Sequence, residues 1–145
     1  DAPYFPFPPK ATFRARADAL VPDPSHTLGV HIRRTDHRKA IQGSPTAGFV
    51  EEIARHLSAA PGTRVFLATD DATEEATLKR HFGDAVFTAP ARILDRGAQT
   101  GIEDALVDML ALSRCHTILG STGSTFSPLA AQWGGAKLKV ITAAQ

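Results

Sequence analysis

The chain of 145 residues is long enough to form one globular domain with its own core and too short for two domains of ordinary size. Its 43% hydrophobic and 21% charged residues are typical of globular proteins and exclude disordered and fibrous classes, while a formal net charge of +1 provides no broad field for nucleic acid. The single cysteine excludes an internal disulfide and a cysteine-based zinc site and favours a reducing compartment.

The sequence contains no apolar run of the ~20 residues needed for a membrane span and no signal-peptide pattern at its start. We therefore expect a cytoplasmic protein with neither a membrane nor a nucleic-acid partner. Because the first residue is not Met, we expect the chain to be a processed or shortened piece.

Residues 1–25 are expected to form a proline-rich tail and a short helix, separate from a domain formed by residues 26–145. Four prolines alternate with three aromatic residues in residues 1–10, which favours an extended tail. A helical pattern from Ala11 to Leu20 follows and is ended by two prolines.

From residue 26 onward, short apolar runs typical of strands alternate with amphipathic helical patterns. The predicted strands are Leu28–Ile32, Arg64–Thr69, Ala85–Thr88, Thr117–Gly120 and Lys137–Thr142. The helices between them are predicted to begin at Ser44 as N-cap with Pro45 as the first helical residue, at Asp71 as N-cap, at about Ile102, and at Ser124. This order predicts a Rossmann-like, three-layer α/β fold with a mostly parallel sheet of about five strands. Such sheets bind ligands at the carboxyl ends of their strands.

Polar side chains follow the first predicted strand, in the run His31-Ile32-Arg33-Arg34-Thr35-Asp36. Strand alternation places His31 and Arg33 on one face and the apolar residues on the other. A guanidinium group binds phosphate oxygens bidentately and keeps its charge, so Arg33 or Arg34 suits a diphosphate, and Asp36 can orient one of them. A surface ion pair between Arg34 and Asp36, and a hydrogen-bonded sheet histidine, are the structural alternatives.

Glycine and hydroxyl residues form the loop after the fourth predicted strand, Gly120-Ser121-Thr122-Gly123-Ser124-Thr125. Backbone N–H groups and the positive end of the next helix converge there, as in anion sites. Gly123 permits close backbone approach, and the hydroxyls of Ser121, Ser124 and Thr125 add donors. The loop lacks the Walker A lysine, the full GxGxxG pattern and a GxSxG pattern. A plain turn with Ser124 as helix cap is the alternative.

Acidic residues at two further places are candidates for binding a metal ion or a ligand. Asp70 and Asp71 follow the second predicted strand, where paired carboxylates suit a metal ion, or where Asp71 only caps the next helix. Asp108 lies on the polar side of an apolar helix, where it is either solvated or accepts hydrogen bonds from a purine base. Cys115 and the adjacent His116 are interpreted as inert, since neighbours at a helix end point apart. No His, Cys and acid cluster has metal-ligand spacing.

Four sequence blocks resemble, in the same order, the donor-binding half of the α1,6-, α1,2- and protein-O-fucosyltransferases. They are Val30–Asp36, Val65–Asp71, Leu106–Ser113 and Ser121–Ser127. The resemblance is closest to the α1,6 group, to which the rhizobial nodulation fucosyltransferases belong, and covers residues 26–142. It implies the carboxyl-terminal half of a two-domain glycosyltransferase-B fold that uses GDP-fucose as donor, inverts the anomeric carbon and needs no metal or other cofactor.

Carried over by position, the resemblance implies that His31 and Asp108 contact the guanine, that Arg33 holds the β-phosphate, and that Ser124 with its neighbours binds the diphosphate. The full predicted donor site consists of His31, Arg33, Arg34, Asp70, Asp108, Ser121, Gly123, Ser124 and Thr125, with Arg33 and Asp36 as candidate catalytic residues.

The chain departs from the α1,6 group where that group carries its catalytic-base glutamate. Residues His37–Gly43 contain no acid, and this segment is one residue shorter than in the α1,6 group. The catalytic base is therefore unassigned, and only Asp36 or His37 lies nearby. The acceptor half is also absent, unless a separate domain or chain supplies it. The sequence thus predicts a GDP-fucose-dependent transferase domain acting on a glycan hydroxyl. A nucleotide-sugar or phospho-ligand binding module without turnover is the alternative, and a phosphate-ester hydrolase is the third reading.

Overall fold

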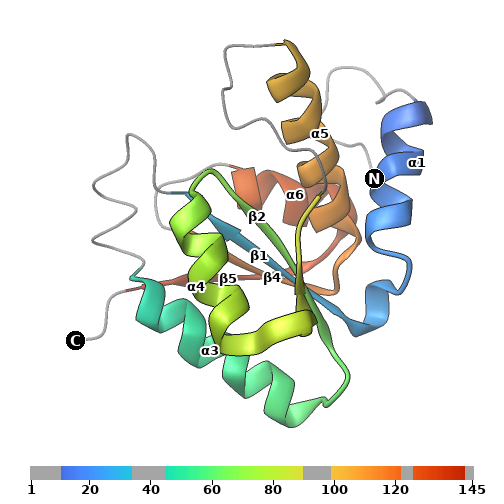
Figure 1. Ribbon diagram of the computed structural model, residues 1–145. Helices are drawn as coiled ribbons and strands as arrows, with labels where there is room; N and C mark the ends of the chain where they lie inside the picture. Colours follow the sequence, from blue (N-terminus) through green and yellow to red (C-terminus); the bar gives the residue numbers. More distant parts are fainter. Residues whose placement is uncertain (1–10, 34–44, 90–98, 122–125, 143–145) are drawn as a thin grey trace.

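The computed structural model of the chain describes residues 11–33, 45–89, 99–121 and 126–142, with the side chains of 99–102 left out of the description (Figure 1). The elements are α1 (Ala11–Leu20), η1 (Pro24–His26), β1 (Thr27–Ile32), α3 (Thr46–Ala59), β2 (Arg64–Thr69), α4 (Ala72–Phe82), η2 (Gly83–Ala85), β3 (Val86–Phe87), α5 (Gln99–Arg114), β4 (Thr117–Ser121), α6 (Phe126–Gly134) and β5 (Lys137–Ile141). None of the helices described is long and apolar enough to cross a lipid bilayer.

The five strands form one parallel sheet in the order β3-β2-β1-β4-β5. The chain moves outward from β1 through β2 to β3, and then returns to the other side of β1 for β4 and β5. Helices α3 and α4 cover one face of the sheet, and α1, α5 and α6 cover the other (Figure 1). The predicted Rossmann-like α/β fold is confirmed. The strand order reverses between β1 and β4, which is where sheets of this kind bind ligands.

Strand side chains alternate between two apolar cores, one on each face of the sheet. In β1, Leu28, Val30 and Ile32 are fully buried against α3 and α4. In β2, Phe66 and Ala68 belong instead to the core formed with α1, α5 and α6. The alternation predicted for the first strand is therefore confirmed, and it leaves His31 on the α5 and α6 side.

Helix α1 packs against α5 and shares its core. Ala17 and Val21 are buried with residues of α5 and α6. At the surface, Arg114 in α5 pairs with Asp18 at 2.9 Å and donates from Nε to the carbonyl of Val21 at 2.8 Å. The helical part of the amino-terminal region is thus attached to the sheet domain by both apolar and polar contacts.

The start of α3 corrects one predicted boundary. Pro45 occupies the N-cap position with extended backbone angles, φ −69° and ψ 150°, and the helix begins at Thr46. The carbonyl of Pro45 accepts the N–H groups of Gly48 and Phe49, so the first helical hydrogen bonds begin at this residue. The prediction of Pro45 as the first helical residue was wrong because the fixed φ of proline suits an extended residue equally well. The predicted N-cap Ser44 lies outside the described residues.

The cap of α4 agrees with its prediction. The Asp71 carboxylate accepts the N–H of Thr73 at 2.7 Å and that of Glu74 at 3.4 Å. The carboxylate satisfies backbone donors that the first helical turn leaves unpaired.

Replacing Gly134 by alanine is expected to destabilise the fold. A Cβ at Gly134 would overlap the backbone carbonyl of Ser113, so the end of α6 would have to move away from α5. We predict that Gly134→Ala lowers the free energy of unfolding by about 1–3 kcal/mol in urea denaturation. Helix propensity alone would act in the opposite direction, by up to about 1 kcal/mol. An unchanged or increased unfolding free energy would contradict this close packing.

Candidate functional site

His31 and Asp108 are polar residues buried on the α5 and α6 side of the sheet. His31, near the carboxyl end of β1, is 2% exposed, and Asp108, in the middle of α5, is 5% exposed. The His31 ring stacks on the ring of Phe126, the first residue of α6, with centroids 4.6 Å apart and an interplanar angle of 21°. The structure therefore joins the end of β1 to the start of α6.

Arg33 is the first residue after β1, and its backbone is tied to β4. Its N–H donates to the Ser121 hydroxyl at 3.0 Å, and that hydroxyl donates to the carbonyl of His31 at 3.1 Å. Ser121 is 2% exposed. Because a hydroxyl has a single hydrogen, the hydrogen of Ser121 is used by the protein backbone rather than offered to a ligand.

Two polar atoms at this edge of the sheet are buried and have no hydrogen-bond partner in the part of the chain that the structure describes. They are Nε of Arg33 and Oγ of Ser127, a fully buried residue in the first turn of α6. A buried donor without a partner costs about 1–3 kcal/mol, so such atoms gain most from a ligand that brings acceptors. The Ser127 side chain is fully buried against Gly120 of β4, so of these two atoms the charged Arg33 group is the one that suits an anion, beside the positive end of α6.

The remaining predicted residues divide into two groups. Asp70 is half-buried and directly follows β2, next to the helix cap Asp71. Arg34, Asp36, Gly123, Ser124 and Thr125 lie outside the described residues. No group of three or more His, Cys, Asp or Glu side chains that could hold a metal ion occurs within the described ranges.

Cys115 is buried and its thiol donates to the carbonyl of Ala111 at 3.6 Å. Burial raises the pKa of the Cys115 thiol to about 12, despite the opposing charge of Arg114. The thiolate is therefore disfavoured, in agreement with the interpretation of this residue as inert.

Phe126, Ser127 and Thr69 were not among the predicted site residues. Thr69 donates from Oγ1 to the carbonyl of Ile32 at 2.6 Å, so it binds the end of β1 from the side opposite Ser121. Two signals were available: all three residues lie at the end of a strand or the start of the helix that follows, and all three fall within the Val65–Asp71 and Ser121–Ser127 blocks that resemble the fucosyltransferases. Nothing in their residue types distinguished them from ordinary core and cap residues.

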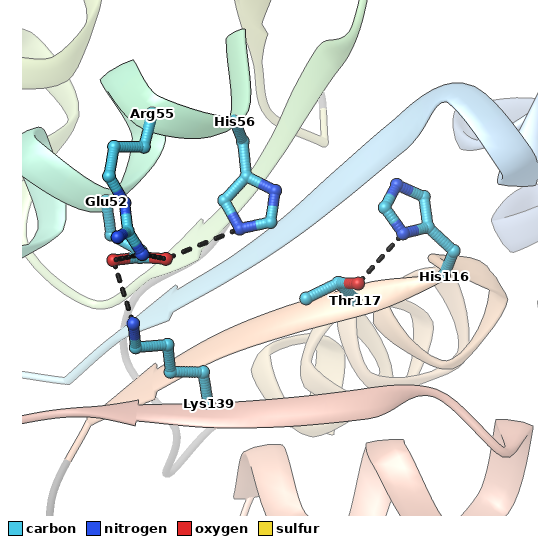
Figure 2. A network of polar contacts seen from close by, with 6 residues as sticks. All are labelled: Glu52, Arg55, His56, His116, Thr117 and Lys139. Carbon is cyan, nitrogen blue, oxygen red and sulfur yellow. Dashed lines mark hydrogen bonds and ion pairs between the residues drawn. The ribbon is translucent and has the colours of Figure 1, made fainter. Parts of the chain in front are cut away.

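A second polar network lies on the other face of the sheet, between α3 and the edge strand β5 (Figure 2). The Glu52 carboxylate accepts from Lys139 Nζ at 3.0 Å and from Arg55 Nη2 at 2.9 Å, and lies 3.6 Å from His56 Nε2. Partial burial raises the pKa of Glu52, but Lys139 and Arg55 outweigh it and hold the pKa below its usual value. The network attaches α3 to β5.

His116 lies just before β4, and its Nδ1 is 2.8 Å from the Thr117 hydroxyl (Figure 2). Removal of water from around the imidazole lowers the pKa of His116, and the charges of His56, His26 and Lys137 lower it further. The folded chain thus favours the neutral ring.

Stability is expected to decrease in mildly acidic solution because of His116. Below the ordinary histidine pKa of about 6.5, the unfolded chain binds a proton at this position more readily than the folded chain. The free energy of unfolding therefore falls as pH drops through this range, until the lower pKa of the folded state is passed. We predict that His116→Gln loses less unfolding free energy than the wild type between pH 7.5 and pH 5.5, as measured by urea denaturation. Equal losses would contradict the lowered pKa.

The solved structures that share this architecture include fucosyltransferases. NodZ α-1,6-fucosyltransferase soaked with GDP-fucose is 31% identical, with a TM-score of 0.62, over 86% of this chain and 42% of that chain. A structure of the fucosyltransferase NodZ from Bradyrhizobium is 30% identical, with a TM-score of 0.61 over 86% of this chain and 42% of that chain. POFUT1 in complex with GDP has a TM-score of 0.63 over 91% of this chain and 46% of that chain, at 13% identity, which shows a common fold alone.

The chain spans less than half the length of these structures, 42% for NodZ and 46% for POFUT1. No protein-family profile and no curated protein sequence matches it.

Proposed function

Starting from the fucosyltransferase-like fold of this chain, we propose that residues 26–145 form the donor-binding domain of a fucosyltransferase and bind GDP-fucose at the carboxyl ends of β1 and β4. The observation that carries the proposal is the position of Arg33. It lies where the strand order reverses, and its Nε is buried with no hydrogen-bond partner among the described residues. The 31% identity to NodZ, whose structure was soaked with GDP-fucose, supports the same ligand class.

Recognition of the base is assigned to the buried pair on the α5 and α6 side. The Asp108 carboxylate accepts from the N–H groups of the guanine edge, and the His31 ring, held by its stacking on Phe126, contacts the same base. The guanine edge presents the N1–H and the 2-amino group side by side, which suits the two oxygens of one carboxylate, and the corresponding edge of uracil or adenine provides fewer donors.

The diphosphate is assigned to Arg33 and to the amino-terminal end of α6, with Ser124 and its neighbours Gly123 and Thr125 supplying further donors. Departure of GDP develops negative charge on the β-phosphate. A guanidinium group and helix N–H groups already in place stabilise this charge without reorganisation, and one well-placed donor is worth roughly 3–4 kcal/mol. Transfer then proceeds by direct, inverting displacement by a glycan hydroxyl. The acceptor site belongs to a separate domain or chain, and the base is Asp36 or His37.

Calorimetric titration of the chain with GDP, GDP-fucose, GDP-mannose and UDP-glucose tests the proposal. We predict binding of the guanine nucleotides, undiminished by EDTA, and none of UDP-glucose. Arg33→Gln should weaken GDP binding about 10- to 100-fold, because a hydrogen bond from a charged group contributes about 1.5–3 kcal/mol.

The matched control is Arg80→Gln, which removes the same charge from an exposed position in the last turn of α4. Its GDP affinity should equal that of the wild type. Unchanged affinity of Arg33→Gln, or equal effects of both substitutions, would exclude the phosphate role of Arg33.

One observation favours a second function, binding of a nucleotide sugar without turnover. Residues His37–Gly43 contain no acid, although a catalytic base is needed near the acceptor. Incubation with GDP-fucose and glycan acceptors distinguishes the two functions. Release of GDP that depends on the acceptor supports the transferase, and binding without release supports the module.

A further inference from the structure

Backbone pairing between β1 and β4 ends before either strand ends. In the described residues the register pairs Leu28 with Thr117, Gly29 with Ile118, and Val30 with Leu119. Beyond this point β1 remains in register with β2 as far as Ile32, and β4 remains in register with β5 as far as Ser121. The two central strands therefore lose their mutual pairing at their carboxyl ends, where the strand order reverses.

The Ser121 hydroxyl makes the hydrogen bonds that the β4 backbone no longer makes. Continuing the register by two residues places Ser121 opposite Ile32. In a parallel ladder, the residue opposite Ile32 donates its N–H to the carbonyl of residue 31 and accepts the N–H of residue 33. Ser121 Oγ makes both bonds, at 3.1 Å to the His31 carbonyl and at 3.0 Å from the Arg33 N–H. One hydroxyl thus replaces a backbone donor and a backbone acceptor.

Thr69 completes the arrangement from the β2 side. Its hydroxyl donates to the Ile32 carbonyl at 2.6 Å and accepts the Asp71 N–H at 3.2 Å. The final carbonyls of β1 are therefore bound by hydroxyls of both neighbouring strands, and Arg33 leaves the sheet from a fixed backbone position.

We infer that Ser121 is a positioning residue for Arg33, and this inference rests on the proposed function. Its hydroxyl holds the Arg33 backbone in strand register while β4 leaves β1, so that the guanidinium group is presented to the diphosphate at the gap in pairing. Because the hydroxyl hydrogen is used by the His31 carbonyl, Ser121 acts on the phosphate through Arg33 and not by donating to it.

A double-mutant cycle on GDP affinity tests this role. Ser121→Ala should weaken GDP binding about tenfold in the wild type, and less than about twofold in the Arg33→Gln background, because residues acting through one another are not additive. Ser121→Thr keeps the hydroxyl and should restore most of the affinity. The matched control is Ser113→Ala, which removes another buried hydroxyl, one that donates to the Leu110 carbonyl at 2.6 Å. It should leave GDP affinity unchanged in both backgrounds.

An equal loss in both backgrounds would overturn the inference, because Ser121 would then act independently of Arg33. Amide hydrogen exchange gives a readout that needs no ligand. The Arg33 N–H should be protected in the wild type and in Ser113→Ala, and should exchange rapidly in Ser121→Ala. If the wild type bound no guanine nucleotide, the proposed function would fail while exchange still tested the positioning. Rapid exchange of the Arg33 N–H in the wild type would overturn the positioning role of Ser121.

Discussion

The end of β1 must keep its buried backbone groups hydrogen-bonded although β4 stops pairing with it. Two hydroxyls meet this requirement, that of Ser121 from β4 and that of Thr69 from β2. Unpaired buried backbone groups are costly, so the sheet can lose pairing between its two central strands only where side chains take over. The place where this happens is also the place where the strand order reverses.

The two faces of the sheet differ in the polar residues that they bury. His31, Asp108 and Ser127 are buried on the α5 and α6 side, and His31 and Asp108 are the residues proposed to contact the base. The opposite face, under α3 and α4, is closed by an apolar core and by the Glu52–Lys139 pair. Both faces of the sheet are thus stabilised by apolar cores, whereas the residues proposed to bind the base lie on the α5 and α6 side. Substitutions on the α3 side are accordingly expected to affect stability more than nucleotide affinity.

Local sequence patterns were sufficient to predict the succession of strands and helices along the chain, the alternation of side chains in β1, and the Asp71 cap. They were not sufficient for the Ser121 bonds, because Ser121 meets Arg33 across 88 positions in sequence and only where β4 loses its pairing with β1. The Glu52–Lys139 contact, 87 positions apart, escaped for the same reason. The roles assigned to Arg34, Asp36 and the residues of the loop before α6 stay predictions, since they lie outside the described residues.

The central claim, that a guanine nucleotide binds where β1 and β4 lose their pairing, is tested most directly by following backbone amide resonances during a GDP titration. The largest shifts should occur at Arg33, Ser121 and Ser127, with little change at Glu52 and Lys139 on the opposite face. Shifts confined to the α3 and β5 side, or spread evenly over the chain, would contradict the account.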